Sequence, residues 1–123
     1  MTLITEPLLE VILYVQDMKR EVWFYRDVLG LSIRYPQGLS DYAEEMWVEF
    51  ETGDCTLALH GGAQDQPQTL HEIVFLVSDV AEARQAIVDA GITIGEVRPL
   101  EDGAPIAEGI DPAGHRFAIR AKA

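Results

Sequence analysis

The stretch Glu10-Val-Ile-Leu-Tyr-Val-Gln-Asp17 occurs a second time in this chain, as Glu72-Ile-Val-Phe-Leu-Val-Ser-Asp79. Each copy has an acidic residue, five mostly apolar residues, a polar residue and an aspartate, and the offset is 62 residues at both ends, 72 minus 10 and 79 minus 17. An apolar run of this length predicts a strand, and the closing aspartate is a typical N-cap for a following helix. The sequence therefore predicts one supersecondary unit that is used twice.

The residues after each copy predict the same further elements, one helix and then three strands. In the first half we expect a helix over 18–29, stopped by Gly30, and strands over 31–35, 46–51 and 55–60. In the second half we expect a helix between Asp79 and Gly91, and strands over 92–98, 104–110 and 115–120. The predicted fold is α+β, a single domain made of two βαβββ modules, module 1 over about 7–60 and module 2 over about 71–121.

Alternation along the strands predicts which side chains turn away from the helix of each module. Successive strand residues point to opposite faces, and the aliphatic set of the first strand, Val11, Leu13 and Val15, suits the helix side. The same reasoning puts Met46, Val48 and Phe50 on the helix side. The opposite faces should then carry Glu10, Tyr14, Trp47, Glu49, Ala58 and His60 in module 1, and Glu72, Arg116, Ala118 and Arg120 in module 2.

The composition excludes several classes of partner and compartment. Nine basic residues against 21 acidic ones give a formal charge of −12, which disfavours nucleic acid and anionic membrane surfaces and favours a neutral or cationic small molecule. No apolar run approaches the roughly 20 residues of a membrane helix, and the first residues lack the pattern of a signal peptide. Cys55 is the only cysteine, which excludes an internal disulfide and a multi-cysteine zinc site, so we expect a cytoplasmic protein.

Four motifs carry a family resemblance: Val15-Gln-Asp17, Trp23-Phe-Tyr-Arg-Asp-Val-Leu-Gly-Leu31, Val77-Ser-Asp79 and Asp111-Pro-Ala-Gly114. With the repeated βαβββ order, the chain resembles the vicinal oxygen chelate superfamily, which includes glyoxalase I, extradiol dioxygenases, fosfomycin-resistance enzymes and bleomycin-resistance proteins. The resemblance covers nearly the whole chain. It implies that curved mixed sheets of two modules enclose a cavity and that the protein is a homodimer, with modules paired either within one chain or between chains.

The resemblance also implies where a metal would bind. In metal-dependent members a first-strand ligand lies five residues before the valine of Val-x-Asp, which falls on Glu10 and Glu72 in this sequence. The fourth-strand ligand, usually glutamate, falls on Ala58 and Ala118, and alanine cannot bind a metal. His60 lies two residues beyond Ala58 on the same face and could replace one lost ligand. The predicted ligands for one divalent ion are therefore Glu10, Glu72 and His60.

Two glutamates facing one cavity repel each other, and three arrangements relieve the repulsion. A divalent ion could lie between them, arginines of the last strand could pair with them, or one could stay protonated and act as a general acid or base. Aromatic walls with few polar groups also suit a flat or apolar ligand. The residues predicted to bind a ligand are Tyr14, Trp47, Glu49, His60, Arg116 and Arg120.

These observations favour a small-molecule-binding protein that resembles the bleomycin-resistance branch, without the full metal-ligand set. The missing ligands at Ala58 and Ala118 and the acidity both agree with that interpretation. The alternative is a divalent-metal-dependent lyase/isomerase or dioxygenase of the glyoxalase type, with Glu10 or Glu72 as the catalytic base. The identity of the ligand or substrate does not follow from the sequence.

Overall fold

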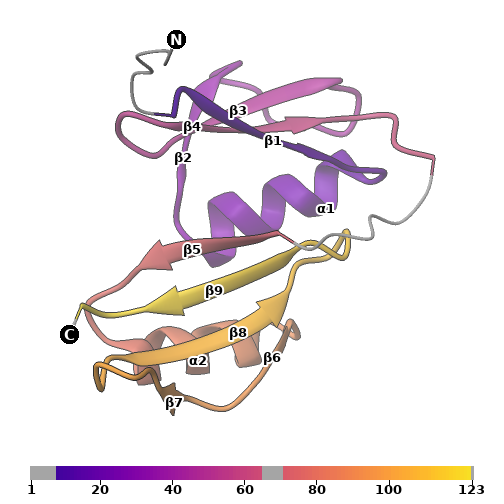
Figure 1. Ribbon diagram of the computed structural model, residues 1–123. Helices are drawn as coiled ribbons and strands as arrows, with labels where there is room; N and C mark the ends of the chain where they lie inside the picture. The colour runs from indigo at the N-terminus through magenta and orange to yellow at the C-terminus, as the bar shows by residue number, and fades with distance from the viewer. Residues whose placement is uncertain (1–7, 65–70, 123) are drawn as a thin grey trace, which may run out of the picture. The chain divides into compact units, whose positions relative to one another are not determined.

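The computed structural model describes residues 8–64 and 71–122 and divides the chain into two compact units, Met1–Gln64 and Asp65–Ala123. Each unit contains one mixed sheet with a helix packed on one of its faces (Figure 1). The predicted α+β class with two βαβββ modules is confirmed. None of the helices within 8–64 and 71–122 is long and apolar enough to cross a membrane.

The first unit forms a four-stranded sheet in the order β1-β4-β3-β2, with β1 parallel to β4 and the other pairs antiparallel. This order places the two sequence-distant strands β1 and β4 side by side, in the register Glu10 to Thr56 through Tyr14 to His60. The elements of the unit are β1 Glu10–Tyr14, α1 Met18–Val22, a π-helix Trp23–Val28, β2 Ser32–Tyr35, β3 Trp47–Glu51 and β4 Thr56–His60.

The helix of the first unit begins as predicted and then widens. Asp17 is its N-cap, accepting the Arg20 N–H at 3.1 Å, and Gly30 ends it with a positive φ of 81°. The predicted helix is present, as an α-helix over Met18–Val22 that continues as a π-helix over Trp23–Val28. The wider turn keeps consecutive apolar side chains inside, since Phe24 and Tyr25 are both almost fully buried.

The core of the first unit lies between this helix and the sheet. Val48, Phe50 and Leu59 are fully buried, and the Tyr25 ring lies 5.8 Å from the Phe50 ring. Met46, predicted to join this core, is 58% exposed. It precedes β3 at the end of the sheet, beside two glycines that have no side chains to cover it.

The second unit repeats the arrangement, with strand order β5-β9-β8-β6 and β5 parallel to β9. A further short strand, β7, also pairs with β8. The helix α2 packs against β6, β8 and β9 (Figure 1). The elements are β5 Glu72–Leu76, α2 Val80–Asp89, β6 Thr93–Ile94, β7 Arg98–Pro99, β8 Pro105–Ile110 and β9 Arg116–Arg120.

The prediction of one strand over 92–98 is wrong, because the chain leaves the ladder after β6 and returns as β7. At the break, the Gly95 N–H donates to the Glu108 carbonyl at 2.8 Å, and the Gly95 carbonyl accepts from Arg84 Nε at 2.7 Å. The arginine of α2 therefore satisfies a backbone group that a continuous strand would have paired. The pairing resumes where Arg98 lies opposite Ile106.

Gly109 fixes the position of β8 on the core. A Cβ atom there would lie 2.6 Å from the Thr93 carbonyl oxygen and 2.9 Å from Cζ of Phe117, which is fully buried. Only glycine fits this close approach of backbone and ring. Because strand residues alternate, packing Gly109 on the core turns its neighbour Glu108 to the other face of the sheet.

Candidate functional site

Each unit offers one candidate site, the face of its sheet that is turned away from the helix. We name as the first open face the side of β1–β4 that carries Glu10, Tyr14, Arg34, Trp47, Glu49, Thr56, Ala58 and His60. We name as the second open face the side of β5–β9 that carries Glu72, Val74, Leu76, Arg98, Glu108, Ile110, Arg116, Ala118 and Arg120. All the site residues predicted from sequence lie on these two faces.

One end of the first open face is aromatic. His60 lies between Tyr14 on β1 and Trp47 on β3, with ring centroids 5.0 Å and 6.0 Å away. Its Nδ1 is 2.8 Å from the carbonyl oxygen of Gly61. A carbonyl can only accept, so Nδ1 carries the proton of the neutral ring and Nε2 keeps the lone pair. The His60 imidazole is therefore held in one tautomer, between the rings of Tyr14 and Trp47.

Glu49 lies beside Ala58 on the same face and is held by two donors. Trp47 Nε1 donates to its Oε2 at 2.7 Å, and Arg34 donates to its Oε1. The hydrogen bond from Trp47 and then the pairing with Arg34 lower the pKa of Glu49, while burial works in the opposite direction. The first open face therefore carries a fixed carboxylate next to the alanine where the family resemblance implies a ligand.

Glu10 and His60 are not brought together within the first unit. Glu10 pairs with Thr56 and Tyr14 pairs with His60, so the two candidate ligands are separated by four residues along parallel strands. At the usual rise this is about 13 Å, too far for two side chains that stand perpendicular to the sheet to share one ion. The geometry of the first unit therefore disfavours one ion held by both Glu10 and His60, while a site that joins either residue to Glu72 of the other unit stays a prediction.

The second open face repeats the carboxylate beside the alanine. Glu108 lies opposite Ala118, and its Oε1 accepts from Arg98 Nη2 at 2.5 Å and from Nε at 3.2 Å. This corresponds to Arg34 and Glu49 of the first face. In each module, then, an arginine near the second strand holds a third-strand glutamate beside the fourth-strand alanine.

Glu72 adds a second carboxyl group to this face. Burial, then a hydrogen bond with Glu108 and the charge of Glu108, raise the pKa of Glu72, against the lowering effect of Arg116 and Arg98. The pKa of Glu108 is lowered, chiefly by its hydrogen bond from Arg98 and next by the one with Glu72. The two carboxyl groups thus shift in opposite directions, because Glu108 has the closer guanidinium partner and Glu72 is the more buried of the two.

Arg116 lies close to both carboxyl groups without a hydrogen bond to either. Its Nη2 is 3.6 Å from Oε2 of Glu72 and 4.0 Å from Oε2 of Glu108. The other predicted arginine, Arg120, forms its ion pair with Asp102 at 3.7 Å and donates to the Ala121 carbonyl. Of the two arginines, only Arg116 is therefore in an ion pair with a predicted glutamate.

Sequence reasoning missed three of the residues that shape these faces: Arg34, Arg98 and Glu108. A signal for Glu108 was present, because Ala58 and Ala118 correspond, and antiparallel pairing places one third-strand residue opposite each. Those residues are Glu49 and Glu108. The weak alternation of the strand over 104–110 concealed the second one.

Neither unit alone offers a set of donors that fits a divalent ion. Among residues 8–64 and 71–122, no three His, Cys, Asp or Glu side chains form a group that could hold a metal. On the second face, Glu72 and Glu108 are paired with each other and with guanidinium groups, which occupy the positions a cation would take. Within each unit, the glutamates beside the alanines are therefore paired with arginine guanidinium groups.

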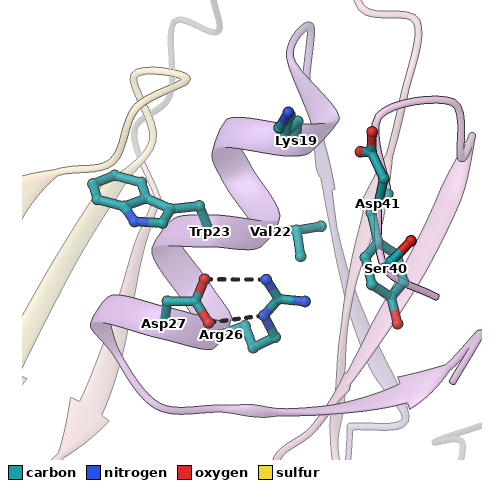
Figure 2. Close-up of a pocket in the computed structure, with 8 residues that line it drawn as sticks. Lys19, Val22, Trp23, Arg26, Asp27, Ser40 and Asp41 are labelled. Carbon is teal, nitrogen blue, oxygen red and sulfur yellow. Dashed lines mark hydrogen bonds and ion pairs between the residues drawn. The ribbon is translucent and has the colours of Figure 1, made fainter. Parts of the chain in front are cut away.

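A separate pocket lies on the helix side of the first unit, between α1 with its π-helical extension and the loop before β3 (Figure 2). Its volume is about 180 Å³. Arg26 and Asp27 form a two-point ion pair at 2.8 Å and 3.1 Å within its wall, as the dashed lines in Figure 2 mark. Lys19, Ser40 and Asp41 also line the pocket, so its wall is polar on both sides.

The family model of the Glyoxalase/Bleomycin resistance protein/Dioxygenase superfamily matches residues 8–119. The chain belongs to this superfamily. Comparison with curated protein sequences gives no match.

Solved structures of this superfamily fold align over almost the whole chain. A protein of unknown function from Agrobacterium tumefaciens has 25% identity and a TM-score of 0.78, covering 98% of both chains. Lactoylglutathione lyase from the same organism has 21% identity and a TM-score of 0.71, covering 95% of this chain and 94% of its own. Fosfomycin resistance protein FosX from Mesorhizobium loti has 17% identity and a TM-score of 0.73, covering 98% and 95%. At identities of 21% and 17%, lactoylglutathione lyase and FosX show only that the fold is shared, so the function of this chain must be argued from its own residues.

Proposed function

We propose that this protein binds a small molecule on its open faces, in the manner of bleomycin-resistance proteins, and does so without the full metal-ligand set of the superfamily. The observation that carries the proposal is the repeated Arg–Glu pair beside an alanine, Arg34–Glu49 with Ala58 and Arg98–Glu108 with Ala118. Both alanines are fully buried. Where metal-dependent members supply a ligand, this chain supplies a methyl group and a carboxylate already neutralised by a guanidinium.

The first open face supports a neutral or cationic aromatic group as the bound moiety. Tyr14 is exposed, and Trp47 and His60 are half-buried, so flat π surfaces are accessible beside the Glu49 carboxylate. Such a combination attracts planar cations through stacking and charge. The strongly acidic chain adds a long-range attraction for the same class of ligand.

Metal content and ligand binding of the purified chain test the proposal. We expect less than stoichiometric metal by elemental analysis after incubation with divalent ions, and thermal stabilisation by planar cationic compounds. Trp47→Phe should weaken that stabilisation, whereas Trp23→Phe, on the helix, is the matched control. Near-stoichiometric metal that is lost in both Glu10→Gln and Glu72→Gln would overturn the proposal.

A metal-dependent lyase, isomerase or dioxygenase is the second candidate, and one observation favours it. His60 is fixed with Nδ1 donating to a backbone carbonyl, which is the arrangement that orients Nε2 of metal-binding histidines. Under this alternative, His60→Gln would abolish metal uptake, as would Glu72→Gln. Retained uptake in His60→Gln would remove the only structural argument for this candidate.

A further inference from the structure

We infer that the second open face binds a carboxylate group carried on an apolar body, with the Arg116 guanidinium as its anchor. The inference rests on the proposed function, because it names the chemical class that one of the two faces takes. It differs from the expectation drawn from net charge, which favours neutral or cationic ligands over the whole chain.

The available hydrogen-bond donors of Arg116 are the first observation. Its side chain is 45% exposed, and its ion-pair distances of 3.6 Å and 4.0 Å lie beyond hydrogen-bond range. Over residues 8–64 and 71–122 no hydrogen bond of this guanidinium is found, whereas Arg98 on the same face donates twice to Glu108. A planar guanidinium with unused donors matches a carboxylate at two points.

The local charge of the face is the second observation. Three guanidinium groups, Arg98, Arg116 and Arg120, stand on it against the carboxyl groups of Glu72 and Glu108. Because Asp102 pairs with Arg120 at 3.7 Å, three guanidinium groups meet three carboxyl groups, so this face lacks the negative excess of a chain with a formal charge of −12.

The apolar neighbours of Arg116 are the third observation. Val74 and Leu76 on β5 and Ile110 on β8 point to the same side and are all exposed. Ile110 lies directly opposite Arg116, and Val74 lies opposite Ala118, whose short side chain adds no polar group. Exposed aliphatic side chains around one guanidinium suit an amphiphilic acid rather than a fully polar anion.

The same geometry favours a ligand with one negative charge over a ligand with two. The oxygens of Glu72 and Glu108 lie within 4.0 Å of the Arg116 nitrogen. A dianion such as a phosphate ester would meet Glu108 at close range with one available guanidinium to offset it. A monoanionic carboxylate is therefore favoured over a phosphate or phosphonate.

Arg116 is also what distinguishes this face from the first one. Counting from the corresponding alanines, the residue two before Ala58 is Thr56 and the residue two before Ala118 is Arg116. The Arg–Glu pairs are common to both modules, but this position is not. The difference assigns the acid-binding role to the second face alone.

Binding of hexanoate, followed by backbone amide shifts of the labelled full chain, tests the inference, with hexyl phosphate and hexylammonium as charge controls. We expect millimolar hexanoate to shift the amides of β5 and β9, more strongly than either control compound. Arg116→Gln should weaken hexanoate binding about tenfold, the usual effect of removing a charged hydrogen-bond donor. Lys122→Gln, an exposed change of the same charge in the same unit, should leave it unaltered.

Each outcome decides the inference separately from the proposed function. Absence of shifts in β5 and β9 of the wild type, tighter binding of hexylammonium or hexyl phosphate there, or unchanged affinity in Arg116→Gln would overturn it. Arg116→Lys, which keeps the charge and loses the two-point geometry, should bind with intermediate affinity even if the glutamine variant is unstable. Shifts confined to the first unit, with planar cations bound and no metal, would leave the proposed function standing while the inference fails.

Discussion

Replacing Gly109 by alanine should damage the second unit far more than an ordinary glycine substitution. The added Cβ would lie 2.6 Å from the Thr93 carbonyl oxygen, and ordinary contact begins at 3.4 Å, so these atoms must separate by about 0.8 Å. Phe117 blocks relief on the other side, because its Cζ would be 2.9 Å from the same Cβ and its side chain is fully buried.

We expect Gly109→Ala to lose about 2–4 kcal/mol of unfolding free energy, since overpacking one well-packed site typically costs 1–3 kcal/mol and two neighbours clash here. For a chain of this size the midpoint of thermal unfolding should fall by about 10–15 °C. The measurement is urea and thermal unfolding of the full chain. Amide shifts of Glu108 and its ladder partner Ala118 would show whether the site face is displaced.

Gly95→Ala is the matched control, because a Cβ there would be 3.5 Å from the Glu108 carbonyl oxygen, an ordinary contact. It should change stability by less than about 0.5 kcal/mol. Adding Phe117→Leu to Gly109→Ala should recover only part of the loss, because the clash with the Thr93 backbone remains. Equal stability of Gly109→Ala and Gly95→Ala would refute the reasoning that β8 needs a glycine to sit on the core.

Two further predictions concern acidic residues of the second unit. The pKa of Glu72 is raised in the folded state, so the unfolded chain ionises first as pH rises through the ordinary carboxyl pKa of 4.5, and stability is lost as pH rises further. Glu72→Gln should therefore become more stable relative to wild type as pH rises above about 4.5 in urea unfolding, and a difference independent of pH would contradict this. Asp111 is buried, and its Oδ1 accepts the Ala113 and His115 N–H groups at 3.0 Å and 2.8 Å, so Asp111→Ala should lower the free energy of unfolding by about 2–3 kcal/mol. The control Asp41→Ala loses one exposed hydrogen bond, from the Ala43 N–H, and should lower it by less than about 1 kcal/mol. Equal losses in urea unfolding would contradict the argument from burial.

The repeated pattern was enough to predict the order of elements, because strand and helix periods and the capping residues Asp17 and Asp79 are local signals. It was not enough to predict the break at Gly95. That break depends on Arg84, eleven residues earlier on α2, which binds the carbonyl that the strand gives up. The π-helical turns after Val22 were missed for a related reason: an apolar stripe widened by neighbouring residues fits either helix type.

The site was predicted less completely, and the reason is again contacts between strands. The predicted residues all lie on the open faces, but their partners come from other strands. Glu49 was identified as a negative group, whereas its neutralisation by Arg34 depends on the bulged pairing of β2 with β3. Arg98 belongs to a two-residue strand that no periodicity could reveal.

Comparing the two modules distinguishes the side chains that stabilise the sheet faces from the side chains that would select a ligand. Both modules keep an Arg–Glu pair beside a buried alanine, although the arginines lie in strands of different length and register. Around these common pairs, the fourth strand carries Thr56 and His60 in the first module and Arg116 and Arg120 in the second. The Arg–Glu pairs, which both modules share, are explained by the need to balance charge on a sheet face. The side chains that differ between the modules make the first face aromatic with a carboxylate, and the second face aliphatic with guanidinium groups. Ligand selectivity should therefore follow positions 56, 60, 116 and 120, and exchanging Thr56 with Arg116 should exchange which face binds an organic acid.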